Sequence, residues 1–163
     1  MLKNGLQKIK GYERLVAMFH NPQTFDDAEI INMYFSRGNT LECAENDNWD
    51  LHVYPSLVVD FVIFDNLYQS NDPDANLSEI RLEFIDIRNI NLLNFDDQNV
   101  IRDLNIKSLF SKQIQDNLLE VSWGGVSHTV DFICSKIELK QVKPLAKENN
   151  GKIKRDTHSK KGQ

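Results

Sequence analysis

LSEIRLEFIDIRNI, residues 77–90, alternates apolar and polar side chains as a β-strand with one buried face does. Ile80, Leu82 and Phe84 hold one phase of this alternation, whereas Ile85 and Ile87 hold the other. A β-bulge would explain the change of phase, because one extra residue turns every later side chain to the opposite face. The stretch therefore predicts a bulged strand with one face in the core.

Further strands are predicted on both sides of this stretch. From residue 28 to residue 68 the apolar residues are mostly β-branched or aromatic, and Gly38-Asn39 offers a turn between two strands. Residues 99–110 predict a further short strand, and residues 118–142 predict a hairpin. This hairpin is expected to turn near Gly124-Gly125, where glycines would supply positive φ angles. No repeated βαβ spacing occurs, so antiparallel pairing is expected.

The N-terminus predicts a helix instead of a strand. Ile9, Tyr12, Val16 and Phe19 recur three or four residues apart, which places them on one helical face, and Pro22 stops the helix a few residues later. The expected fold is therefore an α+β domain, mostly antiparallel β-sheet, with the N-terminal helix packed on one face.

The length of 163 residues, of which 40% are apolar, predicts one domain. We expect this domain over residues 1–143. Residues 144–163 are expected to form a basic, disordered tail, because their dense charge cannot support a core. The net charge is -5, but the residues from Lys140 onward carry +6, which leaves -11 on residues 1–139. Such an acidic domain disfavours nucleic acid and anionic membranes and favours a basic partner.

Several classes of site are disfavoured by composition. Cys43 and Cys134 are too few for a disulfide framework and too scattered for a metal knuckle, so both are expected to be buried thiols. His128 and Cys134 fall six residues apart in one predicted strand, which is roughly 20 Å and beyond hydrogen-bond reach. No apolar run approaches the ~18 residues of a membrane span. A cytoplasmic protein without a cofactor, metal or catalytic set is expected.

Carboxylates cluster in TFDDAEIINMYFSR, residues 24–37, as Asp26, Asp27 and Glu29. In a strand, Asp27 and Glu29 would project to one side and could perform acid-base chemistry or hold a cation. An Asx turn followed by a solvated Glu29 is the favoured alternative. The second acidic patch is FDDQNVI, residues 95–101, which contains Asp96, Asp97 and Asn99; here an Asx turn and an acidic contact surface are equally compatible with the sequence.

Trp123 precedes the predicted hairpin turn, so it is expected to be partly exposed and able to anchor an interface. The candidate partner-binding residues are thus Asp26, Asp27, Glu29, Asp96, Asp97, Asn99 and Trp123.

Four motifs in order carry a family resemblance: GYERLVAMF, TFDDAEIINMYFSR, FDDQNVIRDLNI and FICSKIEL. Over roughly residues 9–142 the chain resembles the immunity protein 50 family of bacterial polymorphic toxin systems. Residues 25–29 match a Phe-His-Asp-Ala-Glu type of motif with Asp26 where His is usual, a departure that weakens any metal or proton-transfer role. Residues 99–101 match an Asn-Val-Ile segment. The resemblance implies a cytoplasmic antidote that binds its cognate toxin without catalysis.

The sequence thus predicts a monomeric or homodimeric protein that neutralises a toxin by stoichiometric binding. An acidic surface would be steered to a basic toxin, and a nuclease domain would fit, since polyphosphate-binding enzymes present a positive cleft. Two alternatives remain open. A small enzyme using Asp27 and Glu29 would need a cleft with convergent polar groups, and a self-associating β-rich module would need an exposed sheet edge.

Overall fold

The computed structural model describes residues 5–19, 25–43, 49–64, 77–94, 99–109, 117–125 and 128–145. The elements in these segments are a 3-10 helix η1 (Leu6–Lys8), a helix α1 (Tyr12–Met18) and strands β1 (Ala28–Ser36), β2 (Asn39–Cys43), β3 (Trp49–Val53), β4 (Ser56–Phe64), β5 (Leu77–Ile85), β6 (Arg88–Leu93), β7 (Val100–Ile101), β8 (Asp103–Leu109), β9 (Leu118–Gly124), β10 (Thr129–Cys134) and β11 (Lys136–Pro144). The predicted α+β class with mostly β-sheet is confirmed.

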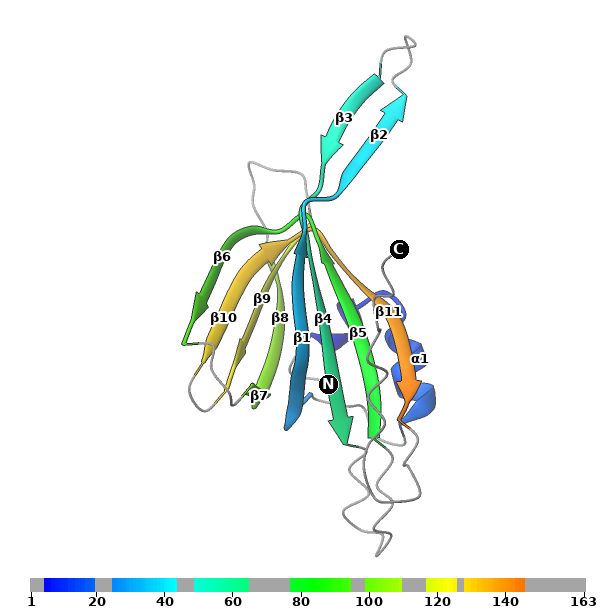
Figure 1. Cartoon of the computed structure of the whole chain (residues 1–163), viewed down its shortest axis with the longest axis vertical. Coiled ribbons are helices and arrows are strands. Elements are labelled where there is room, and N and C mark those ends of the chain that lie inside the picture. Colours follow the sequence, from blue (N-terminus) through cyan, green and yellow to red (C-terminus); the bar gives the residue numbers. More distant parts are fainter. Residues whose placement is uncertain are drawn as a thin grey trace, which may run out of the picture.

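The described strands form two larger sheets and one projecting hairpin. The larger sheets have the strand orders β11-β5-β4-β1-β7 and β6-β10-β9-β8. Neighbouring strands within these sheets pair antiparallel, as predicted. In Figure 1 the two sheets converge at one end, and the β2–β3 hairpin projects beyond that end.

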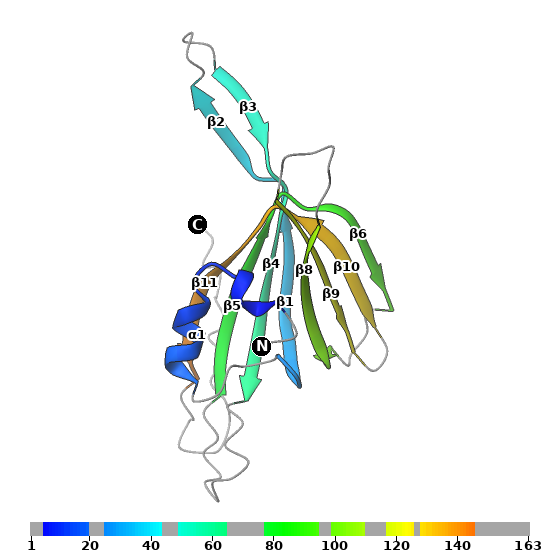
Figure 2. The ribbon, with the colours of Figure 1, turned by 180° about the vertical axis from the view of Figure 1, so that it is seen from behind.

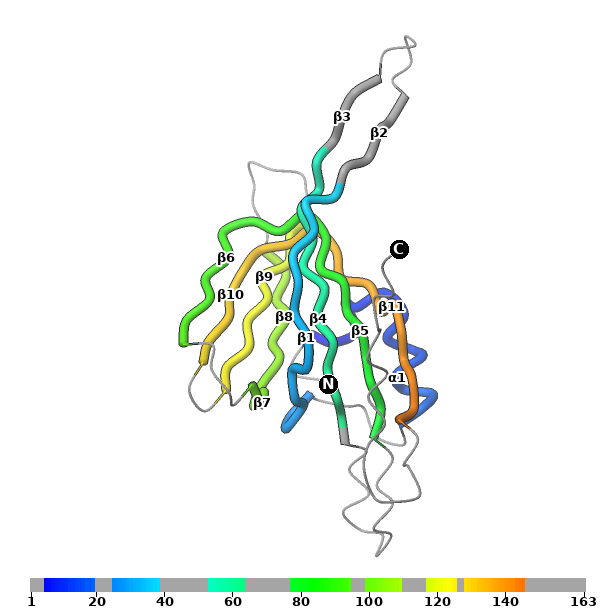
Figure 3. Tube along the Cα trace, in the orientation of Figure 1, coloured from blue at the N-terminus to red at the C-terminus, as the bar shows by residue number. Residues whose placement is uncertain are grey.

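Three strands continue from one sheet into the other with only one or two residues at the corner. β5 passes into β6 at Asp86-Ile87, β7 into β8 at Arg102, and β10 into β11 at Ser135, as the trace in Figure 3 shows. The corners are held by backbone hydrogen bonds, from Ser135 N to Ile85 O at 3.0 Å and from Arg102 N to Gly124 O at 2.8 Å. A strand that turns such a corner presents a different side to the core afterwards.

The predicted bulge near residue 85 is wrong. β4 and β5 pair without a break in register from Ser56–Ile85 to Phe64–Leu77, and the phase changes only afterwards, at Asp86, whose φ is 59°. The change of phase is the corner between two sheets. The same kind of corner divides the predicted strand of residues 99–110 into β7 and β8, and it extends the predicted hairpin of residues 118–142 by β11.

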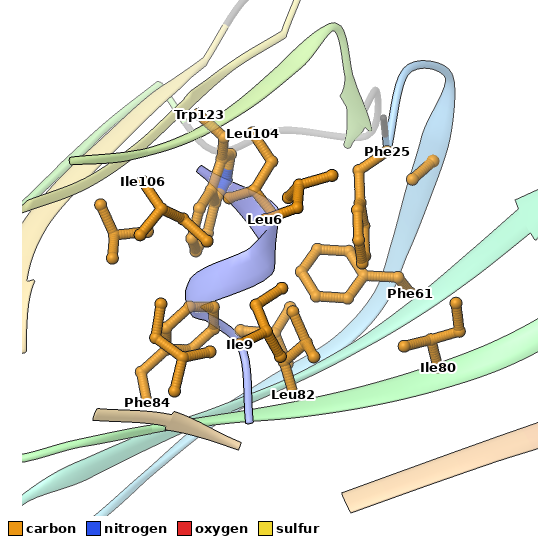
Figure 4. Close-up of a cluster of buried hydrophobic side chains, with 14 of the residues drawn as sticks. Leu6, Ile9, Phe25, Phe61, Ile80, Leu82, Phe84, Leu104, Ile106 and Trp123 are labelled. Carbon is orange, nitrogen blue, oxygen red and sulfur yellow. The ribbon is translucent and has the colours of Figure 1, made fainter. Parts of the chain in front are cut away.

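An aromatic cluster fills the space between the sheets (Figure 4). The Trp123 ring meets Phe132 edge to face with centroids 5.6 Å apart, and Phe61 and Phe84 lie at 6.3 Å and 6.0 Å. Phe25 meets Phe61 edge to face at 5.3 Å. Such pairs add about 0.5–1.5 kcal/mol each beyond the burial of their area. The two sheets therefore share one core.

The N-terminal segment lies along the inner side of the sheets, where η1 enters the aromatic cluster (Figure 4) and α1 lies beside β11 (Figure 2). The backbone of Lys10 bridges to Glu138 on β11. Gly5 is required beside β8, because a Cβ there would clash with the carbonyl of Ile106. The expected helical face is wrong in one position, since Val16 is 46% exposed and Leu15 is buried in its place. The shift follows from the late start of α1, which leaves Ile9 buried outside the helix.

Two predicted turns also differ. Gly38 does not join paired strands, because β1 pairs with β4 and β7 while β2 pairs with β3; it links β1 to the projecting hairpin. β9 and β10 do form the predicted hairpin, but neither Gly124 nor Gly125 has a positive φ. Gly125 is needed because a Cβ would collide with the ring of His128. At the C-terminal end β11 continues to Pro144, and the rest of the predicted tail, residues 146–163, lies outside the described residues.

Candidate partner-binding surface

The first acidic motif and the described end of the second, residues 99–101, meet at one margin of the five-stranded sheet. β1 and β7 pair antiparallel with Ala28 opposite Ile101 and Glu29 opposite Val100. Backbone hydrogen bonds flank this pairing, from Asp27 N to Ile101 O at 2.8 Å and from Ile30 N to Asn99 O at 2.9 Å. The structure thus brings Asp26, Asp27, Glu29 and Asn99 together, and we call these four residues the acidic corner.

Phe25 fixes the acidic corner to the core. Its side chain is fully buried against Phe61, and its carbonyl accepts a hydrogen bond from Ala28 N at 3.1 Å, which closes the turn before β1. Phe25 and Asp27 have φ angles of 61° and 60°, in the left-handed region that non-glycine residues seldom occupy. Such conformations persist only where the surroundings hold them. The buried ring therefore holds a turn that presents Asp26 and Asp27, both exposed, to solvent.

The remaining predicted contact residues have other positions. Asp96 and Asp97 lie outside the described residues. Asn99 is half-buried, and its Oδ1 is buried without a hydrogen-bond partner in the part of the chain that the structure describes.

The expected exposure of Trp123 is wrong. Trp123 is 2% exposed, because Leu119, Val121 and Trp123 alternate along β9 and all point into the core, and the chain turns only after Gly124. The same alternation is visible in the sequence and could have predicted this burial. Trp123 therefore packs the core behind the surface and does not belong to the acidic corner.

Cys134 is a buried free thiol at the end of β10. Burial raises the pKa of the Cys134 thiol to about 12, which disfavours the thiolate that a nucleophile needs. His128 directly precedes β10 and Cys134 is the last residue of this strand, so the two residues do not form a local pair, as expected. Within the described segments no group of three or more His, Cys, Asp or Glu could hold a metal ion. The helices of these segments are too short or too polar to cross a membrane.

A polar ladder that the sequence analysis did not predict crosses the five-stranded sheet. Asn32, Asp60 and Arg81 face one another on β1, β4 and β5. Arg81 donates two hydrogen bonds to the buried Asp60 carboxylate, at 2.6 Å and 2.9 Å, and Asn32 donates a third at 3.2 Å. The hydrogen bond to Asp60 raises the pKa of Arg81. The sequence signal for this ladder was Asp60, the single carboxylate in the apolar run LVVDFVIF.

Basic side chains surround Glu138 at the β11 margin of the same sheet. Lys136 contacts its carboxylate, Lys140 approaches to 2.6 Å, and Lys10 lies at 3.5 Å. The hydrogen bonds from Lys136 and Lys140 lower the pKa of Glu138 to about 2. Charge at the β11 margin is thus matched locally.

Exposed apolar side chains gather where the projecting hairpin leaves the sheets. Tyr34 and Phe35 near the end of β1 are 42% and 57% exposed. Val53, the last residue of β3, is 38% exposed, and Tyr54, which follows it, is 37% exposed. Exposed aromatic side chains of this kind are common anchors in protein interfaces. The sequence analysis had not singled out Tyr34 or Phe35.

Comparison with known proteins identifies a family for this chain. A family model described as Immunity protein 50 matches residues 11–145, which include the acidic corner and every described strand. No curated protein and no solved structure matches the chain.

Proposed function

Because this chain belongs to the Immunity protein 50 family, we propose that it binds a cognate bacterial toxin and neutralises it by stoichiometric occlusion. The toxin would be part of a polymorphic toxin system, and the complex would form in the cytoplasm of the cell that makes both proteins. Family membership carries this proposal, and the acidic corner supplies its chemistry.

The acidic corner supports a basic partner. Its carboxylates project from a turn held by the buried Phe25. Fixed, exposed carboxylates attract a basic surface over several ångströms and speed its approach. A nuclease domain fits this chemistry, because its nucleic-acid cleft is positively charged. Occlusion of such a cleft needs no chemical step by the immunity protein.

Short-range contacts would then hold the complex. Tyr34, Phe35 and Tyr54 are exposed aromatic side chains at the opposite end of β1 from the acidic corner. Aromatic anchors contribute most where they become fully desolvated against a partner, and they mainly slow dissociation. We propose that these residues are contact points in addition to the acidic corner.

The test uses the C-terminal domain encoded immediately upstream of this chain as the candidate toxin. Purified toxin is titrated with the protein, and the residual toxin activity is measured at each ratio. Stoichiometric occlusion predicts a break at an equimolar ratio and protection of cells that express both proteins. Inhibition that continues to completion far below an equimolar ratio would indicate turnover, and the binding proposal would fail.

A matched variant separates binding from catalysis. Asp27→Asn combined with Glu29→Gln keeps side-chain size while removing two charges of the acidic corner. The proposal predicts weaker toxin binding by this variant. It also predicts that the substitutions remove no hydrolytic activity from the protein.

A further inference from the structure

Strand β6 is an edge that no described strand covers. Among the other margins of the larger sheets, β11 is bridged by Lys10, β7 continues directly into β8, and β8 lies against η1, where Lys8 donates to Ser108 at 2.7 Å. β6 pairs with β10 on one side, and all six of its residues are exposed. An open edge presents unpaired backbone donors and acceptors that can pair with another strand.

The outer part of β6 lacks the residues that usually protect an edge. Protected edges carry Lys, Pro, inward-pointing charges or β-bulges. Residues 89–93 read Asn-Ile-Asn-Leu-Leu and carry no Lys, Pro or charge. A bulge interrupts the pairing of β6 with β10 between Arg88 and Asn91, where Asn89 has a φ of 54°, and the pairing is regular from Asn91 to Leu93. Ile90 and Leu92 are each 40% exposed, and Leu93 is 50% exposed. The edge is thus uncharged and apolar in a chain whose first 139 residues carry -11.

We propose that β6 pairs antiparallel with β6 of a second copy of this chain, around a two-fold axis at Asn91. Leu92 pairs with the inward-facing Val130 of β10, so by strand alternation Ile90 and Leu92 lie on one side of β6 and Asn91 on the other. In the proposed register Ile90 of each copy faces Leu92 of the other copy. Asn91, whose Nδ2 donates to the Asp131 carboxylate of β10 at 3.1 Å, faces its own counterpart on the other side of the sheet.

A second copy fits this edge better than the toxin does. A two-fold contact joins a surface patch to itself, so the patch must be complementary to its own pattern, and apolar-amide-apolar around Asn91 satisfies this requirement. The absence of charge also matters, because two copies of an acidic chain repel each other except where the contact carries no charge. A basic toxin would not be attracted electrostatically to this edge, because residues 89–93 carry no charge. The contact leaves the acidic corner free. β6 and β8 lie at opposite margins of the four-stranded sheet, and β8 is the strand that continues from β7, next to the acidic corner.

Sedimentation equilibrium of the full chain tests the proposal across protein concentrations of about 1 to 200 μM, a range in which a weak specific dimer forms. The average mass should rise from 18.9 kDa towards twice that value. Leu92→Lys places a charge at the edge and should keep the protein monomeric over this range. The matched control is Val16→Lys, which charges an equally exposed apolar position on α1 and should leave the mass curve unchanged. Thermal melting verifies that both variants are folded.

Cysteine cross-linking tests the register independently of Leu92. In a background with Cys43→Ser, Asn91→Cys places two thiols directly opposite each other at about 5 Å between Cβ atoms, close enough for a disulfide after a small adjustment. Leu93→Cys on the same strand places them roughly 13 Å apart. Mild oxidation should therefore give covalent dimer much faster from Asn91→Cys than from Leu93→Cys.

Two results would overturn the proposal. A wild-type protein that stays monomeric up to about 200 μM, or equal cross-linking by the two cysteine variants, would contradict pairing at Asn91. Loss of toxin binding in Leu92→Lys, with the wild type monomeric, would assign the edge to the toxin instead. Toxin neutralisation by a monomeric Leu92→Lys variant would leave the proposed function intact, so the two proposals can fail separately.

Discussion

Phe25 shows at the scale of a single residue how the core determines what the surface presents. Its ring is fully buried, its φ is 61°, and the residues that follow it carry the exposed carboxylates of the acidic corner. The sequence predicted an acidic turn here, because Asp residues favour turns. It did not predict that a left-handed Phe anchors the turn, because that conformation depends on Phe61, which is distant in sequence.

Phe25→Ala should lower the free energy of unfolding by about 3–5 kcal/mol, as loss of a large buried aromatic side chain does. Phe35→Ala on β1 is the matched control, because Phe35 is 57% exposed, and it should cost less than about 1 kcal/mol. Urea unfolding followed by far-UV circular dichroism measures both changes. Equal losses from the two variants would contradict the described burial.

Glu138 should make stability depend on acid pH. Its pKa is lowered from 4.5 to about 2 in the folded protein by Lys136 and Lys140, so its ionised form stabilises the fold at neutral pH. This contribution is complete above about pH 4.5, and it is lost as the pH falls towards about 2. Glu138→Gln should therefore be less stable than the wild type at pH 7, and the difference should shrink as the pH falls below 4.5.

Urea midpoints measured from pH 7 to pH 3 test this prediction. Glu120→Gln, which changes an exposed carboxylate on β9, is the control. A difference between Glu138→Gln and the wild type that stays constant over the whole pH range would show that the ionisation of Glu138 does not contribute.

At the scale of the element, the sequence predicted strands better than it predicted their connections. Alternation located the buried face of β5, because a period of two is a local property. It could not reveal the corners at Asp86, Arg102 and Ser135, because whether a strand continues in its own sheet or turns into another depends on partners far away in sequence. The acidic motifs were found separately, but only the pairing of β1 with β7 shows that they meet.

The β4–β5 pair should depend on both partners of its ion pair. Asp60 is 3% exposed, so Arg81→Met would leave a buried carboxylate without its main partner. Such changes cost about 3–5 kcal/mol in fully buried pairs, and we expect roughly 2 kcal/mol here because the Arg81 side chain is 34% exposed. Asp60→Val combined with Arg81→Met removes both charges and should recover most of that loss. Urea unfolding of the two variants checks this, and a double variant that is no more stable than Arg81→Met would contradict the pairing.

At the scale of the whole molecule, the two larger sheets present surfaces of different chemistry. The acidic corner lies at the β1–β7 margin, and basic side chains balance Glu138 at the β11 margin. Residues 89–93 of β6 form an uncharged edge. This separation would allow one chain to bind a basic toxin and a second copy of itself at different places. Net charge alone, which the sequence supplied, could not locate these surfaces.

The central claim is that the acidic corner guides a basic toxin to this protein. It is tested most directly by the association rate with the toxin domain encoded upstream, measured by stopped flow across a salt series. Asp26→Lys combined with Glu29→Lys reverses two charges of the acidic corner. Glu13→Lys combined with Glu120→Lys makes the same change in net charge elsewhere, on α1 and β9. If the acidic corner guides a basic toxin, the first variant should associate about tenfold more slowly than the second at low salt. The difference should shrink as salt shortens the reach of the field to about 8 Å. Equal association rates for the two variants at every salt concentration would contradict the account.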